Sequence, residues 1–173
     1  MGKKLGLPVI DPARDARDPA KKKHPSVDAA RARLGGRVER SERGGAAPAF
    51  GPGAYVDARI ADGSTVVAVV IFATEREAHV LLDGSRLRRV SHAALSARVG
   101  EPPGVLGQLA TDARVFGMLV EGEAVRYADD GGEMRGGRLV EKCRYGALVL
   151  RDDGAVVAVG FRKLWPLPSA GDA

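Results

Sequence analysis

The stretch HVLLDGSRLRRVSHAAL, residues 79–95, returns in looser form as ALVLRDDGAVVAVGFRKL, residues 147–164. In both stretches two short apolar runs flank an Asp-Gly pair, which is a strong signal for a β-hairpin. Gly53 and Gly122 stand ahead of the two stretches, and Leu95 and Leu164 close them, each pair at an offset of 69 residues. Between these anchors the Asp-Gly pair stands one residue later in the second stretch than in the first, LDG against RDDG. This displacement predicts a shift of one residue in the register between the two copies. The repetition indicates two copies of one fold.

The first copy has the pattern of a meander of short strands. Residues 54–60, AYVDARI, alternate polar and apolar side chains, and residues 65–72, TVVAVVIF, form a continuous β-branched run. Both patterns are typical of strands, half buried in the first case and fully buried in the second. Further strands are expected at 78–83 and 86–90, followed by one helical turn at SHAAL.

The second copy repeats this plan. Strands are predicted at residues 122–128 and 138–143, and residues 146–160 predict a hairpin. Between the first two strands, the glycine-rich DDGGEMRGG (129–137) predicts a long hairpin tip. It lacks the Gly-Lys-Ser/Thr ending and the following helix of a phosphate-binding loop.

The remaining segments differ in composition from the two copies. Residues 1–48 mix charges with Pro and Gly and are predicted to be a disordered basic arm, in which a short helix around SVDAARARL would be marginal alone. The linker, 96–118, begins Pro-rich and becomes apolar, so its second part is expected to pack on at least one copy. The copies are placed at 50–95 and 119–165, and a tail at 166–173.

A Gly followed by Val-rich strands, a central Asp-Gly hairpin and a one-turn helix ending in Leu resembles the SH3-like small barrel of Tudor and KOW modules. The resemblance covers 50–95 and 119–165 and rests on spacing. It implies an all-β fold of two tandem SH3-like small barrels behind the arm. It also implies a binding or adaptor role rather than catalysis.

The charge is unevenly distributed. The chain carries +5 with a pI near 9.7, and residues 1–49 hold 12 Lys and Arg against 6 Asp and Glu, while the remainder holds 15 against 16. Spaced cations gain affinity for phosphates through counterion release. The candidate nucleic-acid-binding residues are Lys21, Lys22, Lys23, Arg31, Arg33, Arg37, Arg40 and Arg43 in the arm, with Arg86, Arg88 and Arg89 in the first copy.

Catalytic and metal-binding patterns are not found in the sequence. Cys143 is the one cysteine, which excludes an intramolecular disulfide and a Cys-based zinc site, and it is expected to be a buried thiol. His24, His79 and His92 show no metal-ligand spacing and are expected to be exposed or locally hydrogen-bonded. We therefore expect no catalytic residues, no metal and no cofactor.

Two other ligand classes, a cyclic dinucleotide and a cation held in an aromatic cage, fit the sequence less well. Arg33 and Arg37 have the Arg-x-x-x-Arg spacing of PilZ cyclic-dinucleotide sensors, but DGSTVV places Val67 where that pattern needs Gly. A Tudor-type aromatic cage needs three or four rings around a cation. Neither copy gathers that many aromatic residues at matching positions, so core packing is the favoured role of its rings.

The sequence thus favours a non-enzymatic two-barrel adaptor that binds nucleic acid or a ribonucleoprotein or nucleoid complex. The alternative is a protein-interaction module for a peptide or subunit, and a PilZ-like sensor is a third class. No apolar run reaches the roughly 18 to 20 residues that span a bilayer, so a cytoplasmic protein without membrane contact is expected. The sequence leaves open the ligand, the orientation of the barrels and the oligomeric state.

Overall fold

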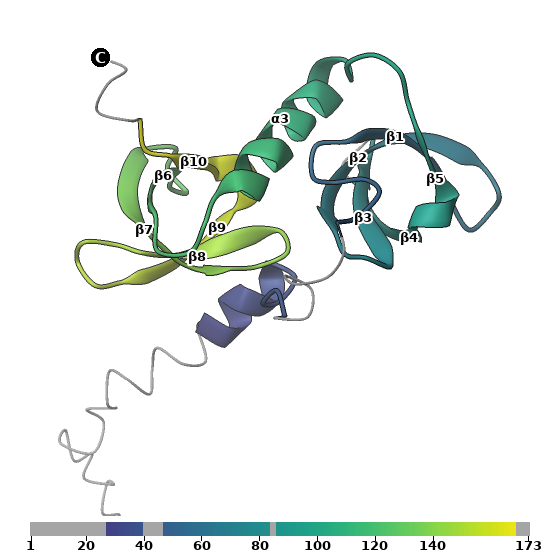
Figure 1. Ribbon diagram of the computed structural model, residues 1–173. Helices are drawn as coiled ribbons and strands as arrows, with labels where there is room; N and C mark the ends of the chain where they lie inside the picture. The colour runs from purple at the N-terminus through teal and green to yellow at the C-terminus, as the bar shows by residue number, and fades with distance from the viewer. Residues whose placement is uncertain (1–26, 40–46, 84–85, 169–173) are drawn as a thin grey trace, which may run out of the picture.

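The computed structural model describes residues 27–39, 47–83 and 86–168. These residues form two five-stranded antiparallel sheets with one long helix, α3 (Gly104–Met118), between them (Figure 1). The predicted mostly antiparallel β architecture is confirmed, with α3 as an addition. No helix within the described residues is long and apolar enough to cross a membrane.

The first sheet contains the strands in the order β4-β3-β2-β1-β5. A single 3-10 turn, η1, precedes the last strand at the position predicted for a helical turn. The elements are β1 (Tyr55–Arg59), β2 (Thr65–Ala73), β3 (Glu77–Leu82), β4 (Arg86–Ser91), η1 (His92–Ala94) and β5 (Leu95–Ala97).

The second sheet repeats this topology in the order β10-β6-β7-β8-β9. Its elements are β6 (Ala124–Ala128), β7 (Met134–Lys142), β8 (Gly146–Leu150), β9 (Val156–Gly160), η2 (Phe161–Lys163) and β10 (Leu164–Pro166). The strand-by-strand match confirms that the chain contains one plan twice.

The offset of 69 holds throughout the repeat, so the expected shift of one residue is wrong. Leu81 pairs with Leu87 in the first hairpin, and Leu150 pairs with Val156 in the second, again 69 residues later. The two turns therefore have the same length. The Asp-Gly pair alone is displaced, because it stands one position later in the second turn.

The prediction of a long glycine-rich hairpin tip at residues 129–137 is also wrong. Met134 pairs with Ala128, as Thr65 pairs with Arg59, so each of these turns has five residues, 60–64 and 129–133. Gly136 and Gly137 belong to β7. A side chain at Gly137 would collide with the Val149 side chain at 2.5 Å and the Leu150 carbonyl at 2.8 Å, so β8 requires glycine there.

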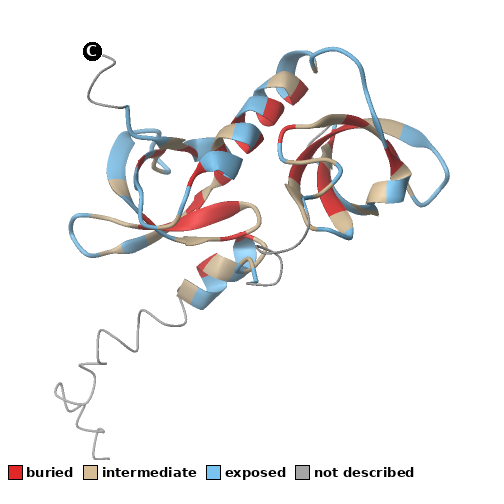
Figure 2. Cartoon of the chain, in the orientation of Figure 1, coloured by how far each residue is buried: buried red, intermediate tan, exposed pale blue. Residues whose placement is uncertain are grey.

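The continuous apolar run of β2 is explained by burial on both of its faces. Ala68 and Val70 point into the interior of the first copy, whereas Val69 and Ile71 contact the cluster around α3. Figure 2 shows that much of β2 is buried, between the interior of the first copy and the cluster around α3. Side chains alternate across a strand, so a strand covered on both sides loses the polar-apolar alternation.

The second part of the linker forms α3 and joins the copies. Its buried residues recur at helical spacing, so they lie on one side of the helix. This side packs on Val69 and Ile71 of the first copy and on Phe161 and Leu164 of the second. The helix residues in this cluster are Leu106, Leu109, Ala110, Ala113 and Phe116.

Part of the predicted disordered arm is folded. Residues 27–33 are helical, and Ala30 and Leu34 pack on Cys143 and Leu148 of the second copy. The expectation of an arm without tertiary contacts is therefore wrong for residues 27–39. Residues 1–26 and 40–46 lie outside the described part of the chain. The helix forms because the second sheet supplies the apolar partner that its Ala-rich sequence lacks alone.

Candidate binding grooves

A groove of about 700 Å³ lies on the first copy between the β1–β2 turn and the edge strand β4. One wall is the turn, held by Asp62, whose carboxylate accepts hydrogen bonds from the Ser64 amide at 2.8 Å and the Ser64 hydroxyl at 2.6 Å. These bonds hold the pKa of Asp62 below its ordinary value. The groove is lined by Arg59, Ile60, Ala61, Asp62, Gly63, Arg88, Arg89, Val90, Ser91 and Ala94.

A second groove of about 670 Å³ lies on the second copy. It runs from the N-terminal helix, past β9 and η2, to the β6–β7 turn. The lining residues are Arg33, Leu34, Tyr127, Ala128, Asp129, Asp130, Gly131, Tyr145, Arg151, Val157, Ala158, Val159, Gly160, Phe161, Arg162 and Lys163.

The two grooves occupy the same place in the repeated fold. At the offset of 69, the first groove's residues 59–62, 88–91 and 94 correspond to 128–131, 157–160 and 163 of the second groove. Arg33, Leu34 and Tyr145 line the second groove in addition. The side chains that line the two grooves differ, but the grooves lie at equivalent positions. The repeated backbone fold therefore determines where each groove lies.

The first groove has an excess of two positive charges, from three arginines and one aspartate. Arg59 and Arg88 form no ion pair with any other described residue, and the Arg88 guanidinium donates only to its neighbour's carbonyl, Leu87 O, at 3.0 Å. Arg89 is 2.8 Å from the Glu77 carboxylate. Two of the three guanidinium groups therefore remain available to an anion.

The second groove is lined by four cations and two aspartates, but Arg151 pairs with Asp153 at 2.7 Å and Arg162 with Asp112 at 3.5 Å, two carboxylates outside the lining. Asp129 pairs with Arg135 at 2.5 Å, and this guanidinium holds the pKa of Asp129 below its ordinary value. Lys163 is 3.9 Å from Asp130. Arg33 is exposed and forms no ion pair within the described part of the chain.

The structure divides the candidate residues from the sequence into four groups. Arg33, Arg88 and Arg89 line the grooves, and Arg86 is exposed on β4 outside the groove lining. Arg31 and Arg37 have structural partners. Those outside the described residues are Lys21, Lys22, Lys23, Arg40 and Arg43.

The two arm arginines with structural partners attach the N-terminal segment to the second copy. Arg31 forms a two-pronged ion pair with Glu141, at 2.6 and 3.0 Å, and a further pair with Asp28. The hydrogen bond to Glu141 raises the pKa of Arg31 above its ordinary value. Arg37 forms a backbone bridge with Cys143. The charge of Arg31 is thus largely matched inside the fold.

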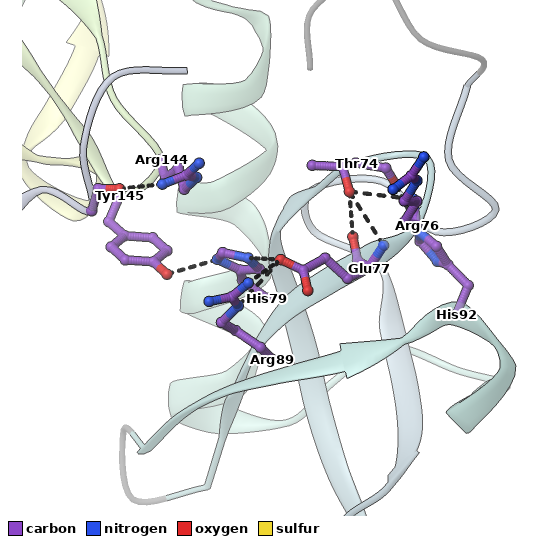
Figure 3. Close-up of polar contacts among 9 residues, drawn as sticks. Thr74, Arg76, Glu77, His79, Arg89, His92, Arg144 and Tyr145 are labelled. Atoms are coloured by element: carbon purple, nitrogen blue, oxygen red, sulfur yellow. Dashed lines mark hydrogen bonds and ion pairs between the residues drawn. The ribbon is translucent and has the colours of Figure 1, made fainter. Parts of the chain in front are cut away.

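A polar network connects the two copies next to these grooves (Figure 3). His79 of β3 is 3% exposed, and its Nδ1 lies 2.6 Å from the Tyr145 hydroxyl of the second copy. Its Nε2 lies 3.1 Å from the Glu77 carboxylate, which also pairs with Arg89. His79 is therefore buried, and besides the expected local hydrogen bond to Glu77 it is bonded across the junction to Tyr145.

Two further findings concern chemistry. Cys143 is buried and free, as expected, and burial raises the pKa of its thiol to about 11. No group of three or more His, Cys, Asp or Glu residues that would suit a metal ion occurs among the described residues.

The aromatic rings do not form a cage in either groove. The second groove is lined by Tyr127, Tyr145 and Phe161, but Tyr127 is 3% and Phe161 8% exposed. These two side chains therefore belong to the core, as the sequence analysis favoured.

Comparison with known proteins gives no relative from which a role is transferred: no family model matches the chain, and no curated protein matches it.

Sequence reasoning missed four cations of the grooves. Arg59 stands at the end of β1, and Arg151, Arg162 and Lys163 stand in the turn before β9 and in η2. These residues are far apart in the sequence and join only through the fold.

Proposed function

We propose that the chain is a non-enzymatic tandem of two SH3-like small barrels whose grooves bind nucleic acid. The barrel proposal is supported by the strand order, which places the fifth strand next to the first, and by the single 3-10 turn before that strand in both copies. Each copy then encloses its own apolar interior. The loops and edge strand remain outside and accessible to a ligand.

The observation that carries the nucleic-acid proposal is the pair of equivalent grooves, each lined by more cations than carboxylates. Each groove contains at least one arginine without an ion partner among the described residues, Arg59 and Arg88 in the first and Arg33 in the second. Lys and Arg near phosphates release condensed counterions, and this release supplies affinity without a fixed geometry. Residues 1–26 add seven Lys and Arg against three Asp. In this proposal they supply long-range attraction, and the grooves hold the phosphates.

A salt titration tests the role of the grooves. We expect wild-type binding to an oligonucleotide to weaken steeply as salt rises. The paired substitutions Arg59→Gln with Arg88→Gln, or Arg33→Gln with Lys163→Gln, each remove two phosphate contacts. Each pair should reduce the slope of log K against log salt by about 1.4 for single strands, or about 1.8 for duplex DNA.

The matched control is Arg76→Gln with Arg126→Gln. It removes the same charge from exposed positions outside both grooves. An equal loss of slope in the control and groove variants would show that net charge, not the grooves, governs binding. The absence of wild-type binding at low salt would reject nucleic acid as the ligand.

One observation favours the alternative, a peptide or subunit as partner. β4 and β9 stand at the ends of their sheets and form one wall of each groove. An edge strand offers backbone donors and acceptors to which an extended peptide adds as a further strand. This alternative predicts protection of β4 and β9 amides from hydrogen exchange on binding, with little dependence on salt.

A further inference from the structure

An apolar cavity of about 310 Å³ lies where the two sheets, α3 and the N-terminal segment meet. The first copy contributes Ile71 and Phe72, and α3 contributes Phe116 near its end. Val38 and Cys143 close it from the N-terminal segment and the second copy. The cavity shares no lining residue with either groove, and its volume is at the lower end of the range of ligand pockets.

The two charged residues of the lining are directed toward neighbouring backbone groups. The Lys142 amine donates to the Gly117 carbonyl at 3.0 Å and the Leu119 carbonyl at 2.7 Å, and it lies 4.9 Å from the centre of the Phe116 ring. Glu121 accepts a hydrogen bond from the Lys142 amide at 2.9 Å. The cavity is therefore suited to an apolar occupant, since a buried polar group needs a partner.

The cavity continues into exposed apolar surface. Val120 lines it and is 57% exposed, and Met118, two residues earlier, is 69% exposed. A segment docked in the cavity would also cover Val120. This continuity indicates an occupant longer than a single side chain.

The chain itself contains a segment with the required chemistry. Among residues 1–26, 40–46, 84–85 and 169–173, which lie outside the described part, the Leu, Val and Ile residues are all in LGLPVI, residues 5–10. Pro8 disfavours helical backbone at Leu7 and favours an extended one. In an extended chain Leu5, Leu7 and Val9 project to one side.

The length of the chain permits this segment to reach the cavity. Val27, at the start of the described chain, packs against the cluster that contains Cys143, and Cys143 also lines the cavity. The 16 residues between Ile10 and Val27 span up to about 55 Å when extended. Lys3 and Lys4 precede the segment, and the Glu123 carboxylate, which accepts a hydrogen bond from the amide of the lining residue Val120, offers them an opposite charge.

We propose that residues 5–10 dock in this cavity of the same chain, with Leu5, Leu7 and Val9 directed into it. A tethered segment has an effective concentration on the order of 1 mM. A segment whose free peptide binds with a Kd of about 0.1 mM would therefore occupy the cavity in about nine molecules of ten. Docking covers the apolar surface at the junction of the two copies.

Cys143 is 1% exposed and unsuited to report on the cavity, so the test places a cysteine at Val120, which lines the cavity and is 57% exposed, by Val120→Cys in a Cys143→Ala background. In this background, the full-length chain and a variant that lacks residues 2–12 are treated with a small maleimide, and the modification rate of the introduced cysteine is measured. Deletion should raise the rate about tenfold, and a synthetic peptide of residues 2–12 should restore protection. Equal rates in the two chains, or a peptide without effect, would overturn the proposal.

Two point variants separate apolar docking from a charge effect. Leu7→Asp with Val9→Asp should match the deletion, while Ala16→Asp with Ala20→Asp adds the same charge outside the segment and should leave the rate unchanged. Protection should persist over about a hundredfold dilution, as an intramolecular contact requires. Protection that disappears on dilution would assign the segment to the cavity of a second copy and reject docking within one chain.

Discussion

At the scale of single residues, His79 is the group whose protonation is coupled most directly to the contact between the copies. The Glu77 carboxylate only accepts hydrogen bonds, so the proton of the neutral ring is assigned to Nε2. Nδ1 then accepts from the Tyr145 hydroxyl. Burial lowers the pKa of His79 below its ordinary value of 6.5, and the neighbouring Glu77 opposes this shift in part.

The lowered pKa predicts a pH-dependent stability. Just below pH 6.5 the unfolded chain binds a proton at this position that the folded chain does not, so stability is lost as pH falls through the folded pKa. We expect the free energy of unfolding, measured with denaturant, to fall between about pH 7 and 5.5. His79→Leu, which places the residue of the equivalent Leu148, should flatten this dependence.

His24→Gln is the control, because it removes a histidine outside the described fold and should keep the wild-type slope. A His79→Leu variant with the wild-type slope would show that another group titrates in this range.

Glycine at equivalent positions offers a second residue-scale prediction. Gly53 and Gly122 both have positive φ, 85° and 93°, and each donates a 2.7 Å hydrogen bond to the second strand of its copy. Alanine in this conformation costs about 1 kcal/mol at either position. At Gly53 alone a Cβ would also meet the Ala110 carbonyl at 2.7 Å, whereas at Gly122 it meets open space.

Gly53→Ala should therefore lower the melting temperature more than Gly122→Ala. Differential scanning calorimetry of the two variants compares them directly. Equal losses would mean that α3 moves away from Gly53 at little cost.

At the scale of elements, the sequence predicted the strands and missed the helix. Alternation and β-branched runs identified the strands because local patterning agrees with their burial. The sequence of α3 carries the helical spacing Leu106, Leu109, Ala113 and Phe116. Its Pro-rich start nevertheless predicts a linker, and the helix forms because tertiary packing compensates for the prolines before it and the glycines within it.

The N-terminal helix was underestimated for a related reason. Its helical propensity alone is marginal, and its stability comes from Leu148 and Glu141, which lie over 100 residues away in the chain. The grooves depend on such distant pairing too. Sequence reasoning found the cations of β4, but not the groove in which they meet Arg59.

Stepwise truncation measures the contribution of this helix. We compare a chain that lacks residues 1–26 with one that lacks residues 1–39. The longer truncation additionally removes the packing of Ala30 and Leu34 and the ion pair between Arg31 and Glu141. The longer truncation should be less stable than the shorter one by about 2 kcal/mol or more, since loss of one buried Leu alone has that effect. Equal denaturation midpoints would mean that the helix does not stabilise the second copy.

At the scale of the whole molecule, the two copies are not equivalent in their cores. The interior of the first copy, with Val70, is a cluster of its own. The interior of the second copy, with Val149, is continuous with α3 and with the outer face of β2. Disruption of the first core should therefore leave the second copy folded, whereas disruption of the second core should also affect the packing of α3 on β2.

Val70→Asp and Val149→Asp test this asymmetry, since both residues are 0% exposed. Val149 is the repeat equivalent of Val80, with which Val70 pairs between β2 and β3. An unpaired buried carboxylate costs several kcal/mol, a large part of the roughly 5 kcal/mol that stabilises a small domain. Trp165 is the one tryptophan and lies in β10, so its fluorescence reports on the second copy alone.

We expect Val70→Asp to lose part of the far-ultraviolet circular dichroism while Trp165 keeps its folded emission, because the cluster around α3 retains most of its members. Val149→Asp should shift Trp165 to the emission of an exposed indole. A shift of Trp165 in both variants would mean that α3 transmits unfolding from the first copy to the second, and the two copies would then form one cooperative unit held together by that helix.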